Sequence, residues 1–164
     1  MALASEFPKA WRIAGRGRPG GRAAAPSVEG MEIAGPHALV FYKVTCSVTQ
    51  MAGPPISRLG DAYPGTVVGV GQDPPDALTV FADTYGWRFP QVPDLAPYAA
   101  SDAYGIVSAP TVVVVDVDGR VADVVESWDR DGVNRASSTL ALLLHAEPVI
   151  VSEPPDGLPA FKPG

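Results

Sequence analysis

Two near-continuous apolar runs separated by a helical stretch constrain the fold of this chain most. They are HALVFYKV at residues 37–44 and TVVGVG at residues 66–71. Unbroken runs of this kind are typical of strands that are buried on both faces. The segment 47–63 between them is expected to be helical, with a kink or break at Pro54-Pro55, because proline removes backbone donors. The sequence therefore predicts a strand, a helix and a second buried strand.

The rest of the chain continues this alternation. The further expected elements are a helix in 72–86, an irregular stretch at 87–94, a short helix in 97–106, two strands in 111–127 joined by a turn at Asp118-Gly119, and an amphipathic helix over 131–145. Alternating strands and helices predict an α/β fold, in which a mixed central sheet is flanked by helices on both faces and the last two strands lie antiparallel at its edge.

The length of 164 residues suits one domain with a genuine core. We expect an N-terminal arm or hairpin over 1–34, the main domain over 35–145, and a Pro-rich tail over 146–164 that is laid on the surface or mobile. The hairpin extension would pair the short apolar pieces at 10–13 and 28–33.

Charge is distributed unevenly along the chain. Residues 1–30 hold five basic and two acidic side chains, a balance of +3, whereas the whole chain carries −6, so the remainder carries −9. An acidic body argues against nucleic acid or an anionic membrane as a partner, because phosphate binding needs a basic surface. The stretch GRGRPGGRAAAP, residues 15–26, is expected to be a solvated loop or arm.

Targeting and metal-binding signals are missing from the sequence. No apolar run approaches the ~20 residues that span a bilayer, and no secretory signal pattern is present, so we expect a cytoplasmic protein. Cys46 is the only cysteine, which excludes an intramolecular disulfide. His37 and His145 fit no ligand spacing, so no metal site is expected.

The stretch FYKVTCSVTQM, residues 41–51, carries the strongest functional signal. A strand runs into Cys46 at a helix start, Pro54 follows eight residues later, and Ala109-Pro110-Thr111 stands just before the hairpin. Together these features resemble the thioredoxin fold, and most closely the TlpA-type disulfide reductases and redoxins. The active stretch of those proteins commonly reads like FYKVTCPVCQM. Here Ser47 replaces the proline and Thr49 replaces the second cysteine.

The resemblance covers residues 37–145 and implies several structural features. It implies a cis peptide between Ala109 and Pro110 and a strand–helix insertion at 67–90. Val40 stands where thioredoxin carries a buried acid that relays protons. The absence of that acid weakens an efficient dithiol cycle.

The resemblance makes Cys46 a nucleophile. A helix N-terminus presents unpaired backbone N–H groups that favour the reactive thiolate. Thr49 could donate a hydrogen bond to that thiolate but cannot resolve a mixed disulfide. The expected catalytic residues are Cys46 and Thr49, and the expected substrate-binding residues are Tyr42, Thr45, Ser47, Ala109, Pro110 and Thr111.

Several functions remain open for this sulfur. The first is monothiol thiol–disulfide exchange resolved by an external low-molecular-weight thiol, without a cofactor, on a small thiol or disulfide or on a protein disulfide. The second is a one-cysteine peroxidase, although Lys43 occupies the position where peroxiredoxins have threonine. The others are an enzyme repurposed for a small metabolite and a non-catalytic binding module. Cys46 as an ordinary buried thiol is the remaining interpretation.

Overall fold

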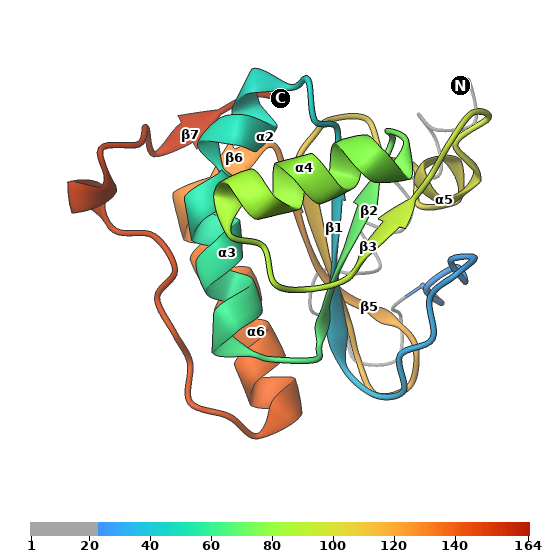
Figure 1. The fold of residues 1–164 in the computed structure, drawn as a ribbon. Helices are drawn as coiled ribbons and strands as arrows, with labels where there is room; N and C mark the ends of the chain where they lie inside the picture. The colour runs from blue at the N-terminus through green and yellow to red at the C-terminus, as the bar shows by residue number, and fades with distance from the viewer. Residues whose placement is uncertain (1–22) are drawn as a thin grey trace.

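The computed structural model of the chain describes residues 23–164. A central sheet is covered by helices, and the C-terminal tail runs along the outside of the helical layer (Figure 1). The elements in chain order are β1 (His37–Tyr42), α2 (Ser47–Met51), α3 (Gly53–Ala62), β2 (Val67–Gly71), α4 (Pro75–Tyr85), β3 (Gln91–Pro93), α5 (Ala99–Ala103), β4 (Thr111–Val115), β5 (Val121–Glu126), β6 (Trp128–Asp129), α6 (Arg130–Leu144), the 3₁₀ turn η1 (Pro154–Asp156) and β7 (Phe161–Lys162).

The sheet is mixed, as the sequence predicts. Its strand order is β3-β2-β1-β4-β5. β1 runs parallel to β2 and antiparallel to β4, and β4 and β5 form the antiparallel hairpin. All residues of β1 and β2 are buried, which explains their unbroken apolar sequences.

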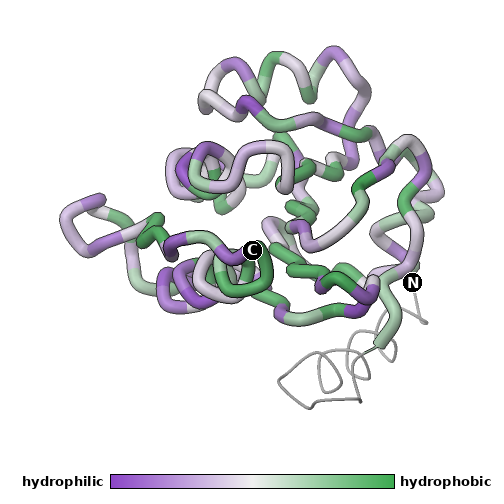
Figure 2. The backbone as a smooth tube through the Cα atoms, turned by 90° about the horizontal axis from the view of Figure 1, so that it is seen from below, coloured by the Kyte–Doolittle hydropathy of each residue, from purple (hydrophilic) through white to green (hydrophobic). Residues whose placement is uncertain are grey.

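Alternate residues of each strand face opposite sides of the sheet, so the core has two halves. Ala38, Val40 and Tyr42 pack with side chains of α3, α4 and α6 on one face. Leu39 and Phe41 pack on the other face, against α5 and the segment that precedes β1. Hydrophobic residues concentrate in the central strands, whereas the helices alternate between hydrophobic and hydrophilic stretches (Figure 2). The expectation of helices on both faces is confirmed.

The helix break near Pro54-Pro55 has a simple geometry. α2 ends at Met51 and α3 begins at Gly53, so both prolines lie in the first turn of α3. The missing N–H of a proline costs little there, because the first N–H groups of a helix have no intrahelical partner.

Two expectations need correction. The stretch 87–94, expected to be irregular, contains the short edge strand β3. Residues 28–33, expected as one strand of an N-terminal hairpin, form a turn and irregular chain, and residues 10–13 lie outside the described part. Val28 is instead buried against the second face of the sheet, where packing rather than strand pairing holds this segment.

No helix within residues 23–164 has the length and apolarity to cross a membrane.

Candidate active site around Cys46

Cys46 is the N-terminal boundary residue of α2, directly after the loop that leaves β1. Hydrogen bonds hold this loop from within, from Asp73 after β2 and from Gln50 of α2. The Cys46 N–H donates to the Lys43 carbonyl at 3.1 Å, and the Val44 N–H donates to Asp73 Oδ2 at 2.8 Å. Gln50 Nε2 donates to the Val44 carbonyl at 2.9 Å. These hydrogen bonds fix the backbone from which the Cys46 side chain projects.

The sheet register brings Cys46 to the loop that precedes β4. Phe41, near the end of β1, pairs with Thr111 at the start of β4. The partly exposed Cys46 thiol donates to the Ala109 carbonyl at 3.4 Å, and the Ala109–Pro110 peptide is cis. Two segments 63 residues apart in sequence thus meet at one sulfur atom.

A cavity of about 280 Å³ opens beside the thiol. The residues that line it include Lys43, Cys46, Gln72, Ala109 and, from the C-terminal tail, Gly164. The volume is close to the lower end of the range for small-molecule pockets, about 300 Å³. The site can therefore receive a small molecule next to the sulfur.

The other expected substrate-binding residues divide into two groups. Thr45 and Ser47 are exposed on either side of Cys46, where a bound molecule can reach them. Tyr42, Pro110 and Thr111 are buried beneath the surface of the site. Of these buried residues, Tyr42 reaches the cavity wall.

Tyr42, at the end of β1, links the site to β3, which lies beyond β2 in the sheet. Its hydroxyl donates to Gln91 Oε1 at 2.7 Å. Burial raises the pKa of the Tyr42 phenol well above its ordinary value, and the charge of Asp73 adds to the effect. The phenol stays neutral at physiological pH and serves as the donor in the hydrogen bond to Gln91.

Thr49 has a buried hydroxyl group that is not paired within the described part of the chain. It is fully buried, and its hydroxyl has no hydrogen-bond partner among residues 23–164. The hydrogen bond that Thr49 could donate to a Cys46 thiolate is not formed with the Cys46 thiol in this structure. A buried hydroxyl without a partner costs about 1–3 kcal/mol.

Replacing Thr49 by valine is expected to raise the free energy of unfolding by about 1–2 kcal/mol, because the isosteric side chain removes the unpaired hydroxyl. Thr111→Val is the matched control. Thr111 is equally buried, but its hydroxyl donates to the Ser108 carbonyl at 2.8 Å, so its loss should lower stability. Urea denaturation measures both changes. A loss of stability in Thr49→Val would mean that the hydroxyl has a partner after all.

The sequence did not point to several residues of the site. Asp73 and Gln72 follow β2 directly, and the ends of neighbouring parallel strands meet at one edge of a sheet, so this signal was available. No sequence feature could have predicted Gly164, because nothing in the proline-rich tail indicates that it lies near Cys46.

Among residues 23–164, no group of three or more His, Cys, Asp or Glu side chains could hold a metal ion.

No protein-family model and no curated protein sequence matches this chain. Solved structures do match. The structure of MTB DsbF in mixed oxidized and reduced forms is 25% identical, with a TM-score of 0.56, and the match covers 68% of this chain and 82% of that one.

Two further structures show the same likeness. A secreted Mycobacterium tuberculosis disulfide oxidoreductase homologous to E. coli DsbE is 23% identical over 66% of this chain and 82% of its own, with a TM-score of 0.55. A thioredoxin-like protein in the oxidized form is 18% identical over 77% of this chain and 98% of its own, with a TM-score of 0.62. The thioredoxin-like fold that the sequence predicts is thereby confirmed.

Proposed function

We propose that this protein performs monothiol thiol–disulfide exchange at Cys46, with a low-molecular-weight thiol as co-reactant. The observation that carries the proposal is the position of the sulfur. Cys46 is partly exposed at the start of α2, beside a cavity and 3.4 Å from the Ala109 carbonyl, while the place of a second cysteine is taken by the buried Thr49. The similar structures of DsbF in mixed oxidized and reduced forms and of a secreted disulfide oxidoreductase support the general redox chemistry.

The reaction has two exchange steps. The Cys46 thiol loses its proton to water, and the thiolate attacks one sulfur of a disulfide RS–SR. An S–S bond forms between Cys46 and RS, the RS–SR bond breaks, and the other RS⁻ leaves and takes up a proton. In the second step an external thiolate attacks the RS sulfur, which releases the Cys46 thiolate and a new disulfide.

The co-reactant is needed because the chain holds no second thiol. Thr49 lacks a sulfur, so it cannot displace the bound RS group. We place the reaction in the cytoplasm, where low-molecular-weight thiols are kept reduced. This chemistry requires no metal and no organic cofactor.

The test is intact mass spectrometry after incubation with hydroxyethyl disulfide. We expect a single mixed-disulfide adduct, its absence in Cys46→Ser, and its removal by added 2-mercaptoethanol. A wild-type protein that stays unmodified would contradict the proposal. Rapid formation of a sulfenic acid with peroxide, but no disulfide adduct, would favour the one-cysteine peroxidase instead.

A further inference from the structure

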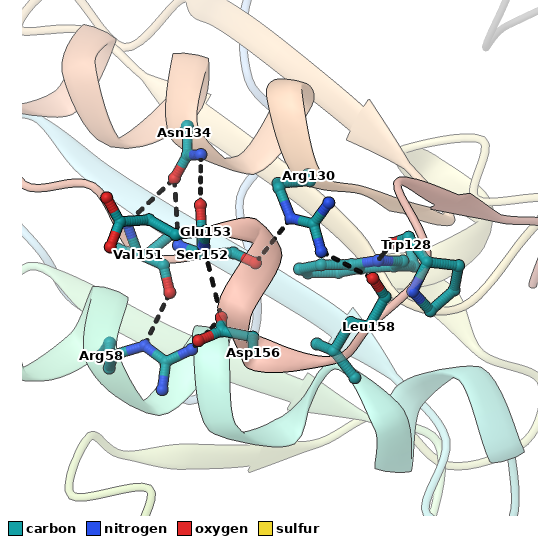
Figure 3. Close-up of polar contacts among 10 residues, drawn as sticks. Arg58, Trp128, Arg130, Asn134, Val151, Ser152, Glu153, Asp156 and Leu158 are labelled. Carbon is teal, nitrogen blue, oxygen red and sulfur yellow. Dashed lines mark hydrogen bonds and ion pairs between the residues drawn. The ribbon is translucent and has the colours of Figure 1, made fainter.

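The C-terminal tail is fastened to the helical layer in two places, and the first is around Val151 and Ser152. Both residues are buried. Asn134 of α6 accepts from the N–H groups of both through Oδ1 and donates through Nδ2 to the Ser152 carbonyl (Figure 3). Arg58 of α3 donates to the Val151 carbonyl at 2.6 Å and pairs with Asp156. This part of the tail is therefore fixed between α3 and α6.

The second fastening holds residues 158–164, which we call the strap. Arg130 Nη2 donates to the Leu158 carbonyl and Trp128 Nε1 to the Pro159 carbonyl, each at 2.6 Å (Figure 3). The Arg130 N–H donates to the Ala160 carbonyl at 2.9 Å. β7 then pairs antiparallel with β6. The bonds that hold the strap are thus made to its backbone. From β7 the chain runs toward α2, where it ends (Figure 1).

The end of the strap reaches the active site. The Gly164 N–H donates to Ser127 Oγ at 3.0 Å. Gly164 packs so closely on Ala109 that a methyl group added to it would overlap the Ala109 carbonyl. That carbonyl is the one that accepts from the Cys46 thiol, and Gly164 forms part of the cavity wall beside the sulfur.

We propose that the strap selects low-molecular-weight disulfides as the substrates of Cys46 by covering the backbone that an extended peptide would need. This inference rests on the proposed function. A peptide that binds as an added strand must pair its main chain with a free backbone edge. At Ala109 the chain's own Gly164 lies directly against the carbonyl and the amide nitrogen of that edge, so an added strand has no room there. A small disulfide needs no such edge, because it reaches the thiol through the cavity of about 280 Å³.

Alkylation tests the shielding without any redox chemistry. The full chain is treated with iodoacetamide, which is small, and with a maleimide that carries a poly(ethylene glycol) chain, which is bulky. Gly164→Val should raise the ratio of the bulky rate to the small rate by about tenfold, because the added side chain forces the strap off Ala109 and increases local opening.

The matched control is Ala160→Val. It introduces the same side chain into the same strap at an exposed position whose backbone, not its side chain, makes the contact. The ratio should stay at the wild-type value in this variant. Equal ratios in Gly164→Val and Ala160→Val would overturn the shielding role of the strap.

Disulfide exchange tests the substrate class. Wild type should form the mixed disulfide with hydroxyethyl disulfide but only slowly with a disulfide-bonded peptide. Gly164→Val should raise the ratio of the peptide rate to the hydroxyethyl disulfide rate, whereas Ala160→Val should leave this ratio at the wild-type value. If wild type reacts equally fast with both, the assigned substrate class is wrong. If neither compound reacts while the alkylation ratios change as expected, the proposed function and its substrate class fail, and the shielding of Cys46 is supported.

Discussion

Replacing Thr49 by cysteine is expected to shorten the lifetime of the mixed disulfide at Cys46 by on the order of a hundredfold or more, because an intramolecular thiol replaces a dilute external one. Cys46 caps α2 and residue 49 lies three positions on, in its first turn, so we expect the two side chains to come within reach of each other. The new thiol can attack the Cys46 sulfur and expel the bound group. After treatment with hydroxyethyl disulfide, mass spectrometry should show the wild-type protein with an adduct. The variant should carry no adduct and should have lost two hydrogen atoms, because residues 46 and 49 form a disulfide.

Thr49→Ser is the control for this experiment. It differs from Thr49→Cys by oxygen in place of sulfur, and its adduct should persist as in wild type. A Thr49→Cys protein that keeps its adduct equally long would show that residue 49 does not lie beside the reactive sulfur. The correspondence between C-x-x-T and a C-x-x-C pair would then be wrong.

The elements that the sequence predicts well are those with strong local patterns. β1 and β2 are unbroken apolar runs because both faces of the sheet are covered, and the hairpin of β4 and β5 has Gly119 at its turn with a positive φ of 73°. Cys46 and the segment Ala109–Thr111 were placed together by a family resemblance. The antiparallel register of β1 and β4 is the physical reason that they meet.

The sequence does not predict the elements whose structure depends on contacts with residues far away along the chain. β3, β6 and β7 are three residues or fewer, too short to show a period. The tail follows its path because Arg58, Arg130 and Asn134 on two helices bind its backbone carbonyl and N–H groups. Backbone acceptors are alike in every sequence, so a tail bound through them leaves no trace in its own residues.

Trp128 belongs to the hydrophobic core and also binds the strap, so its removal is expected to destabilise the protein strongly. The side chain is fully buried, in the core cluster that includes Val133 and Leu140 of α6. Trp128→Ala should lower the free energy of unfolding by about 3–5 kcal/mol, because it loses the buried ring and leaves a cavity. Urea denaturation measures this loss.

Trp128→Phe separates the two roles of this residue. Phenylalanine keeps much of the buried ring but lacks the indole N–H that donates to the Pro159 carbonyl at 2.6 Å. We expect a smaller cost of about 1–2 kcal/mol. We also expect faster reaction of Cys46 with the bulky maleimide relative to iodoacetamide, because the strap loses one of its anchors. If Trp128→Phe destabilises the protein but leaves that ratio unchanged, the indole belongs to the core alone and Arg130 with the β6–β7 pairing holds the strap.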